Sequence, residues 1–316
     1  MTGFPEPSSL VEGRGSSDER HDGSPAERSV GPDPRAARKD DGEGEAGPRY
    51  RRTFDRLRQR GDGAFMPFLM LGDPDLQTSG RLLQAAVDGG ADMLEVGIPF
   101  SDPVADGPVV QAAAERALAG GATTAACLDV LRTFRTANPD IPVGILTYAN
   151  IALARGREAF FAACAEAGVD SVLIADVPAF EAEPWVRAAT AAGVALVMIA
   201  AQNTPEEALA RVADLGGGYT YCLARAGVTG VDQEVRLDHG ALTETLRRLQ
   251  APPAILGFGI SKPEHVRAAL DAGAAGAVSG SAVVQRIAAA ESADAACEAV
   301  RAFTAEMKGA TLGALR

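Results

Sequence analysis

The sequence has 316 residues and carries 30 basic and 42 acidic side chains, which gives a net charge of −12 at pH 7. This acidic balance argues against non-specific binding to nucleic acid or to an anionic membrane surface, and it favours a small-molecule ligand. The length suits a single α/β barrel, which needs about 250 residues, better than two domains.

The first 49 residues differ in composition from the rest of the chain. They are rich in Gly, Ser, Pro, Asp, Glu and Arg, and their few aliphatic side chains larger than alanine are Leu10, Val11 and Val30. Such a segment cannot bury enough apolar surface to offset the entropy of ordering. We therefore expect a disordered extension over 1–49 and one domain over 50–316. A misassigned start codon is an alternative explanation of the extension.

From residue 50 onward, a short helix expected at 50–61 leads into a repeating pattern. An apolar run, a Gly- or Pro-rich loop and an alanine-rich amphipathic helix follow one another, and a glycine ends each helix. The predicted strands are 64–71, 93–98, 143–148, 171–175, 195–200, 219–224, 254–257 and 277–279. Eight strands alternating with helices predict a parallel sheet, and at this length a closed (β/α)8 TIM barrel is favoured over an open doubly wound sheet.

Several helix boundaries are also legible in the sequence. Thr204 and Ser261 each stand three residues before a glutamate, with a proline in the first turn, which predicts a capping hydroxyl at both helix starts. Helix ends are predicted at Ala-Gly or Gly-Gly pairs, where a left-handed residue closes the helix. These pairs are 89–90, 167–168, 192–193 and 272–273.

The remaining composition indicates a cytoplasmic protein without a metal. The cysteines at 127, 164, 222 and 297 form no Cys-x-x-Cys pair, which predicts reduced and mostly buried thiols. The histidines at 21, 239 and 265 form no cluster at metal-ligand spacing. No run approaches the roughly 20 apolar residues that span a bilayer, and no signal-peptide stretch is present.

The segment 93–107 joins a strand and a loop that both carry a carboxylate. Glu95 lies in the middle of an apolar run, and Asp106 precedes Gly107 in the turn-rich loop that follows. Active sites of such barrels lie at the C-terminal ends of the strands, where two acids can give and take protons on opposite sides of one ligand. The structural alternatives are an ion-paired or backbone-capped Glu95 and an ordinary turn at Asp106.

Three glycine-rich segments follow the last three predicted strands, at 226–230, 257–261 and 279–282. Glycines let backbone N–H groups approach an anion, and the helix that begins after Gly280 adds its dipole. Each segment alone fits a simple turn. Together, at the loops where barrels commonly hold a phosphate, they predict a phosphate site built from backbone donors.

Other polar residues near the predicted strand ends are weaker candidates. Asp73, Tyr148 and Asp176 follow strands one, three and four, and each fits either the site or a loop brace. Arg225 fits an ion pair or a role in shaping its loop. Trp185 lies in a predicted helix and is expected to pack.

These segments, read together, resemble the tryptophan synthase alpha chain family. The similarity runs from Phe65 to about Met307 without obvious gaps, and its most specific segment is the carboxylate-bearing one at 94–108. The other matching segments are Pro-Phe-Leu-Met-Leu-Gly-Asp-Pro at 67–74, Gly-Val-Asp-Ser-Val-Leu-Ile-Ala-Asp-Val-Pro at 168–178, Gly-Tyr-Thr-Tyr at 218–221, Gly-Val-Thr-Gly at 227–230, Gly-Phe-Gly-Ile-Ser at 257–261 and Ser-Gly-Ser-Ala-Val-Val at 279–284.

The resemblance implies a lyase that splits indole-3-glycerol phosphate into indole and glyceraldehyde 3-phosphate by a retro-aldol step, without metal or organic cofactor. It also implies a partner, a pyridoxal phosphate-dependent beta chain in an alpha2-beta2 complex, to which indole passes through a tunnel. The loop that carries Asp106 is expected to lie near that partner.

The resemblance also implies roles for single residues. Glu95 would be the general acid and base, and Asp106 would hold the indole N–H and stabilise the charge that develops on the ring. Thr229 would close over the substrate. The expected phosphate contacts are Gly230, Gly259, Gly280 and Ser281, and the expected indole contacts are Phe68, Leu146 and Tyr148.

Three other functions stay open at this point. The extension, and the sequence Ala200-Ala201-Gln202 after strand five, suggest a stand-alone lyase that releases free indole. A catalytically weak activating partner of a beta chain is the second alternative, although both carboxylates are present. A different phosphorylated-sugar isomerase or aldolase is the third, and it would require a Schiff-base lysine or a metal triad that the strand ends do not offer.

Overall fold

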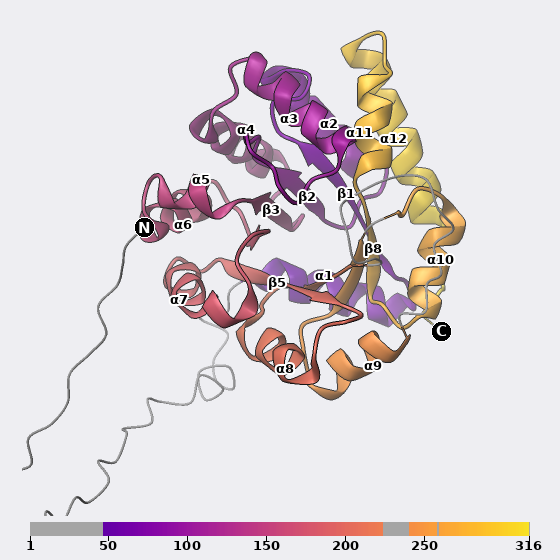
Figure 1. Ribbon diagram of the computed structural model, residues 1–316. Helices are drawn as coiled ribbons and strands as arrows, with labels where there is room; N and C mark the ends of the chain where they lie inside the picture. Colours follow the sequence, from indigo (N-terminus) through magenta and orange to yellow (C-terminus); the bar gives the residue numbers. More distant parts are fainter. Residues whose placement is uncertain (1–46, 224–239, 258, 316) are drawn as a thin grey trace, which may run out of the picture.

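The computed structural model describes residues 47–223, 240–257 and 259–315 of the chain. Eight parallel strands close into a barrel in the order β1 to β8, and the helices cover its outside (Figure 1). The strands are β1 Ala64–Met70, β2 Leu94–Gly97, β3 Val143–Thr147, β4 Ser171–Ile174, β5 Ala195–Ala201, β6 Thr220–Leu223, β7 Ala254–Gly257 and β8 Gly276–Ser279. The TIM barrel prediction is confirmed, and every strand boundary lies within one residue of its predicted position.

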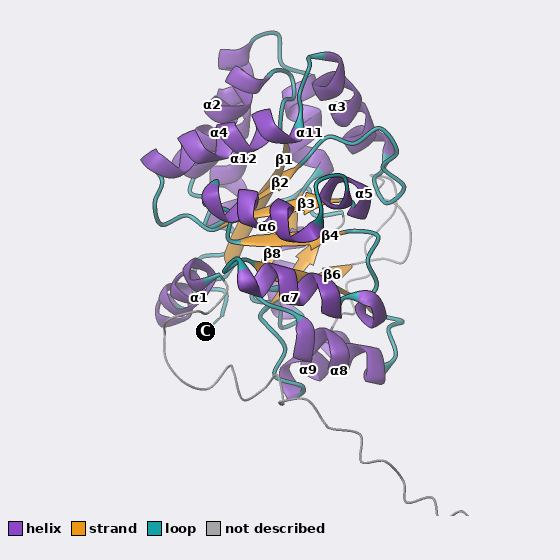
Figure 2. Ribbon diagram, turned by 90° about the vertical axis from the view of Figure 1, so that its left-hand side faces the viewer, coloured by secondary structure: helices purple, strands orange, loops and turns teal. Residues whose placement is uncertain are grey.

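The helices form a layer around the strands, which Figure 2 shows from the side. They are α1 Pro48–Arg60, α2 Leu76–Asp88, α3 Pro108–Ala119, α4 Thr124–Ala137, α5 Ala149–Leu153, α6 Arg157–Glu166, the 3-10 turn η2 Ala179–Glu181, α7 Glu183–Ala191, α8 Glu206–Leu215, α9 Gly240–Arg248, α10 Pro263–Asp271, α11 Ser281–Ala288 and α12 Ala293–Gly309. The predicted disordered extension lies almost entirely outside the described residues. Within those residues, no helix is long and apolar enough to cross a membrane.

The two predicted capping hydroxyls were wrong. Helices α8 and α10 begin one residue later than predicted, with Pro205 and Lys262 at their N-caps and no side-chain cap. The Thr204 hydroxyl instead accepts a hydrogen bond from the backbone N–H of Ala201 at 3.0 Å, which closes the turn after β5. The predicted helix ends are confirmed, because the glycine at the second position of each pair, at 90, 168, 193 and 273, has positive φ.

The cysteines match the prediction of free and mostly buried thiols. All four are free, and three of them are buried while Cys297 is partly exposed. Burial raises the pKa of the Cys127, Cys164 and Cys222 thiols to about 12. These three thiols therefore stay protonated at neutral pH and act as small apolar side chains.

Helix α1 closes the end of the barrel at which the strands begin. The Tyr50 ring is buried, its hydroxyl lies 2.9 Å from Ser171 Oγ at the start of β4, and its ring packs at 5.4 Å against Tyr219. A Cβ at Gly144 would lie 2.9 Å from the Tyr50 hydroxyl oxygen and 2.7 Å from Ser171 Oγ. The glycine in β3 therefore makes the room that these two side chains occupy.

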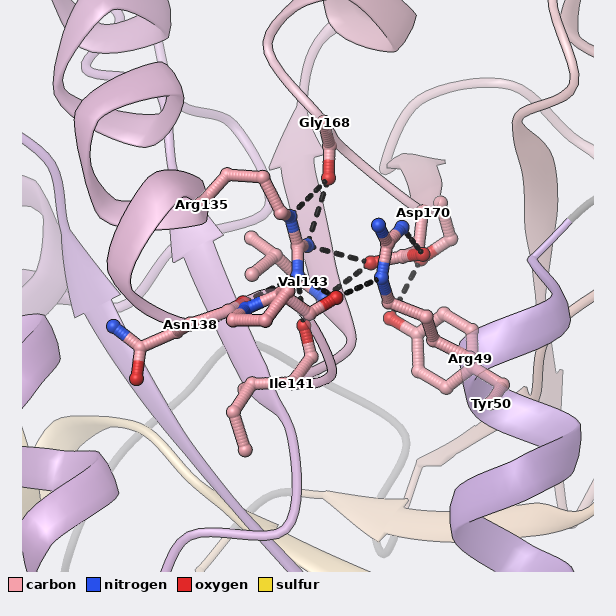
Figure 3. Close-up of polar contacts among 10 residues, drawn as sticks. Arg49, Tyr50, Arg135, Asn138, Ile141, Val143, Gly168 and Asp170 are labelled. Atoms are coloured by element: carbon pink, nitrogen blue, oxygen red, sulfur yellow. Dashed lines mark hydrogen bonds and ion pairs between the residues drawn. The ribbon is translucent and has the colours of Figure 1, made fainter.

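A buried charge cluster fastens α1 and α4 to this end of the barrel (Figure 3). Asp170, directly before β4, accepts at 2.9 Å from Arg135 Nη2 in α4, from Arg49 Nη1 in α1 and from the backbone N–H of Val143. Arg135 also donates twice to the Gly168 carbonyl, at 3.0 and 2.7 Å. Its remaining acceptors are the carbonyls of Asn138, Pro139 and Ile141. Every polar side-chain atom of Asp170 and Arg135 therefore has a hydrogen-bond partner.

Replacing Arg135 by alanine is expected to lower the free energy of unfolding by about 3–5 kcal/mol, because the change leaves a buried carboxylate short of a cation. Urea denaturation followed by circular dichroism measures the difference. Arg132→Ala in the same helix is the control, since Arg132 is half exposed and pairs with the exposed Asp129. It is expected to stay within about 0.5 kcal/mol of the unmodified chain. Equal losses of unfolding free energy in the two variants would contradict the stabilising role of the ion pair between Arg135 and Asp170.

Candidate functional site

Glu95 lies inside the barrel, in the middle of β2. The strand register places it level with Phe68 of β1 and Gly144 of β3, and its side chain is only 1% exposed. Its Oε1 accepts a hydrogen bond from the Tyr219 hydroxyl at 2.7 Å. Tyr219 directly precedes β6, on the opposite side of the barrel, so this hydrogen bond crosses the barrel interior.

Burial sets the proton affinity of Glu95. It raises the pKa of the carboxyl group from 4.5 to about 7, while the Tyr219 hydrogen bond opposes the rise and the nearby Asp106 carboxylate adds to it. Among the described residues, no Arg or Lys side chain contributes to this shift, so that part of the chain offers Glu95 no ion pair. A carboxyl group with a pKa near 7 can both donate and accept a proton at neutral pH.

Asp106 lies in the loop between β2 and α3 and is half-buried. Burial raises its pKa from 3.8 to about 6, and a hydrogen bond from the Tyr148 hydroxyl opposes the rise. The same hydroxyl accepts from the backbone N–H of Ala105 at 3.2 Å, and Gln111 Nε2 donates to the Asp106 carbonyl at 2.7 Å. The loop backbone is therefore tied at Ala105 and at Asp106, the residue that bears the carboxylate.

The two carboxyl groups are close enough to interact electrostatically. Each acts on the buried Tyr221 hydroxyl, whose pKa is raised by burial and then by repulsion from Glu95 and Asp106. Asp106 also contributes to the raised pKa of Glu95. Glu95 stands within β2 and Asp106 in the loop that follows it, and the structure brings together the two residues that the sequence singled out.

Aromatic and aliphatic side chains line the same end of the barrel. Phe68 is 4% exposed and lies level with Glu95, and Tyr148, after β3, is stacked against Phe100 at 5.2 Å. Leu146 is half-buried and lies level with Gly97, which is two residues after Glu95 along β2. These three predicted indole contacts therefore stand at the level of the carboxylates or directly beyond them.

The glycine segments after β7 and β8 are joined by a side-chain hydrogen bond. Ser279 Oγ, at the end of β8, donates to the Ile260 carbonyl at 2.6 Å. Gly259 has a φ of 77°, a conformation that favours glycine, and Gly280 is the N-cap of α11 without a side-chain cap. The first N–H groups of α11, including that of Ser281, are thus available to an anion. Gly230, Thr229 and Arg225 lie outside the described residues.

The sequence interpretation missed several residues that shape this space. Tyr219 and Tyr221 are two residues apart, which puts both side chains on the inner face of one strand. A Cβ at Gly257 would lie 2.3 Å from the Tyr221 hydroxyl oxygen, and a Cβ at Gly97 would lie 2.8 Å from the Phe68 ring. The alternation of Gly-Tyr-Thr-Tyr was the available signal, because two tyrosines on one face of a buried strand need polar partners.

The weaker candidates brace loops or pack. Asp73 forms a two-point ion pair with Arg116, and Asp176 Oδ1 accepts from the backbone N–H of Ala149 at 2.8 Å. Trp185 is buried, with Arg157 over its ring at 5.3 Å. Within the described part of the chain, no three His, Cys, Asp or Glu side chains are grouped to hold a metal ion.

Comparison with known proteins identifies a family of similar sequences. The family model described as "Tryptophan synthase alpha chain" matches residues 54–312. The tryptophan synthase alpha chain of Vibrio vulnificus strain YJ016 is 49% identical over 264 residues, which cover 83% of this chain and 98% of that protein. The alpha chain of Shewanella amazonensis is 52% identical over 239 residues, covering 76% of this chain and 90% of that protein.

Solved structures agree with these relatives. A structure of Mycobacterium tuberculosis tryptophan synthase superimposes with a TM-score of 0.76 at 28% identity and covers 85% of this chain and 99% of that one. A structure of the tryptophan synthase a2b2 complex from Pyrococcus furiosus gives a TM-score of 0.72 at 35% identity, with 78% and 98% covered. The family model, the sequence relatives and the barrel itself agree, and the chain belongs to the tryptophan synthase alpha chain family.

Proposed function

We propose that Glu95 and Asp106 carry out the retro-aldol cleavage by which this lyase, as a tryptophan synthase alpha chain, converts indole-3-glycerol phosphate to indole and glyceraldehyde 3-phosphate. The observation that carries the proposal is the pair of neighbouring carboxyl groups, one buried and one half-buried, whose pKa values are both raised. Acids whose environments shift their pKa values toward neutrality are typical of proton-transfer sites.

Glu95 serves both proton transfers of the reaction. In its protonated form it gives a proton to C3 of the indole ring, which turns the ring into a cationic electron sink. The carboxylate then takes the proton of the glycerol hydroxyl next to the scissile bond while the carbon–carbon bond breaks and its electrons return to the ring. Aldehyde and indole leave, and Glu95 ends protonated as it began. A pKa of about 7 suits both halves of this cycle.

Asp106 balances the charge that appears on the ring. Protonation of C3 places positive charge at the indole nitrogen, and an ionised Asp106 that accepts the ring N–H stabilises that charge more in the transition state than in the bound substrate. The Tyr148 hydroxyl keeps the carboxylate in place and favours its ionised form. Asp106 therefore stabilises charge on the ring, whereas Glu95 transfers the protons.

The rest of the site suits the two ends of the substrate. We place the phosphate on the backbone N–H groups of Gly259, Gly280 and Ser281, because α11 directs its free amide groups and dipole there. Gly230 is proposed to complete this anion site, and Thr229 to close over it. The indole ring is proposed to lie between Phe68 and Tyr148, with Leu146 beside them.

We further propose that the chain works with a beta chain in an alpha2-beta2 complex in the cytoplasm. The Pyrococcus furiosus structure of similar fold is of a tryptophan synthase a2b2 complex. A stand-alone lyase and a catalytically weak activating partner are the alternatives. Both carboxyl groups stand in the site, which favours an active enzyme over the second alternative.

An indole-release assay with indole-3-glycerol phosphate tests the proposal. The purified chain is assayed alone and with a tryptophan synthase beta chain, and we expect indole release that increases when the beta chain is added. High turnover that no beta chain changes would favour the stand-alone lyase. Failure to form indole under either condition would contradict the proposed function.

The pH dependence of kcat/KM, which follows the ionisation of the free enzyme, is expected to be bell-shaped, with limbs near pH 6 and pH 7. The active form needs an ionised Asp106, so activity rises with pH through its pKa of about 6, and it needs a protonated Glu95, so activity falls through a pKa of about 7. Rates measured from pH 5 to 9 give both limbs. Since the substrate phosphate also titrates near pH 6, Asp106→Asn is the control, and the low-pH limb should disappear in it. A rate that keeps rising above pH 8 would rule out a protonated Glu95 as the starting form.

A further inference from the structure

An ion pair at the catalytic end of the barrel has no part in the proposed chemistry. Asp73, in the loop after β1, binds Arg116 of α3 through two bonds, Nε to Oδ1 and Nη2 to Oδ2, each 2.8 Å long. The Asp73 side chain is 1% exposed and that of Arg116 is 38% exposed. The hydrogen bonds to Asp73 raise the pKa of Arg116, as expected for a charge-assisted pair. A two-point pair of this kind fixes both the distance and the orientation of its partners.

The loop after β1 is also pressed against the end of α3. Gly72 has a φ of 85°, and a Cβ there would lie 2.6 Å from Ala122 Cβ and 3.2 Å from Ala117 Cβ. The backbone at Gly72 thus packs directly against an alanine in the last turns of α3 and another just after the helix. The pair between Asp73 and Arg116 holds two surfaces that are already in close contact.

The other end of α3 carries Asp106. The helix begins at Pro108, and the Gly107 carbonyl accepts from the N–H groups of Val110 and Gln111 at 3.0 Å. The Gln111 side chain then reaches back to the Asp106 carbonyl at 2.7 Å. Because an α-helix moves as a rigid rod, a shift of α3 at Arg116 moves the backbone that carries the Asp106 carboxylate.

We propose that Asp73 and Arg116 are positioning residues, which set the place of the Asp106 carboxylate through the rigid helix α3. The proposal rests on the proposed role of Asp106. It assigns to the loop after β1 a function in the reaction without any contact with the substrate. Placement is decisive for such a carboxylate, because an error of about 1 Å in a catalytic group can lower the rate about 100-fold.

Arg116→Lys is the informative variant. Lysine keeps the positive charge beside the buried Asp73, so the pair is not lost, but it replaces the planar two-point contact by a single one. Helix α3 can then turn or slide relative to the loop after β1. Arg135→Lys is the matched control, because Arg135 also pairs with an aspartate whose side chain is 1% exposed, but at the opposite end of the barrel.

Three measurements are made on both variants of the full chain, with the beta chain present. In Arg116→Lys we expect kcat to fall at least about tenfold. The low-pH limb of the rate profile should move to lower pH, because a looser loop lets water reach Asp106 and relieves the burial that raises its pKa. Hydrogen exchange of the backbone amides from 105 to 111 should accelerate. Arg135→Lys should lower the thermal midpoint without moving the limb or the exchange of 105–111.

The outcomes show whether the positioning role of Asp73 and Arg116 or the proposed role of Asp106 is wrong. If both variants change the rate only in proportion to lost folded protein, and the limb and the exchange stay where they are, the positioning role is overturned. Asp106→Asn is assayed alongside them. If that variant keeps full activity, the proposed role of Asp106 fails, and the inference fails with it for that separate reason.

Discussion

Glu95→Gln is expected to abolish indole release while it stabilises the folded chain at pH 8. Glutamine preserves the shape of the side chain and can still accept the hydrogen bond from Tyr219, but it can neither give nor take a proton. Loss of a positioned general acid and base lowers kcat by about 10²- to 10⁴-fold. Since Glu95 serves two transfers in the proposed cycle, we expect the upper part of that range.

The gain in stability follows from the raised pKa of Glu95. The unfolded carboxyl group ionises near 4.5 and the folded one near 7, so between these values the folded chain holds a proton that the unfolded chain has lost. Stability therefore falls as pH rises through this window, and the loss is complete above pH 7. Glutamine removes this loss, which corresponds to about 3 kcal/mol at pH 8.

Thermal unfolding at pH 5 and pH 8 measures this effect beside the activity assay. The stability difference between Glu95→Gln and the unmodified chain should be larger at pH 8 than at pH 5. Glu115→Gln is the control, because Glu115 is exposed on α3. It should keep full activity and stay within about 0.5 kcal/mol of the unmodified chain at both pH values. An inactive Glu95→Gln that is also less stable at pH 8 would indicate a structural defect and contradict this account of Glu95.

Asp106→Asn is expected to lower kcat by about 10²- to 10³-fold, the usual cost of removing one preorganised electrostatic contact to a transition state. Asparagine still accepts a hydrogen bond from the ring N–H, so substrate binding and KM should change little. Steady-state kinetics with indole-3-glycerol phosphate measure both constants. A rise in KM with unchanged kcat would mean that Asp106 binds the substrate and its transition state equally well.

The double variant adds a separate test of cooperation between the two acids. If Glu95 and Asp106 act on one ring in one step, their losses should not add, and Glu95→Gln with Asp106→Asn should be little slower than Glu95→Gln alone. Additive losses would instead place the two carboxylates in independent steps.

The strands and the two acids were predictable from the sequence for simple physical reasons. Strands of a closed parallel barrel are buried on both faces, so they read as short apolar runs between glycines and prolines. An acid such as Glu95 in such a run conflicts with its surroundings, and the conflict marks a functional position. Asp106 was found only because it shares a loop with that strand, since Asp before Gly is ordinary turn chemistry.

The contacts that tune these acids were not predictable, because they join distant parts of the chain. Tyr219 reaches Glu95 across 124 residues of sequence, and Tyr50 was expected only in a short leading helix although it fills the start of the barrel. The predicted capping roles of Thr204 and Ser261 were wrong for a local reason. A shift of one residue moves a hydroxyl out of the capping position, and helix boundaries are the least determined part of such a pattern.

The most direct test of the central claim is a crystal structure of Glu95→Gln with indole-3-glycerol phosphate bound. We expect the indole nitrogen at roughly 3 Å from the Asp106 carboxylate, C3 of the ring facing the side chain at position 95, and the phosphate on the backbone amides of Gly259 and Gly280. A ring nitrogen turned away from Asp106, or a phosphate bound away from the loops after β7 and β8, would contradict the claim that two acids act on opposite parts of one indole.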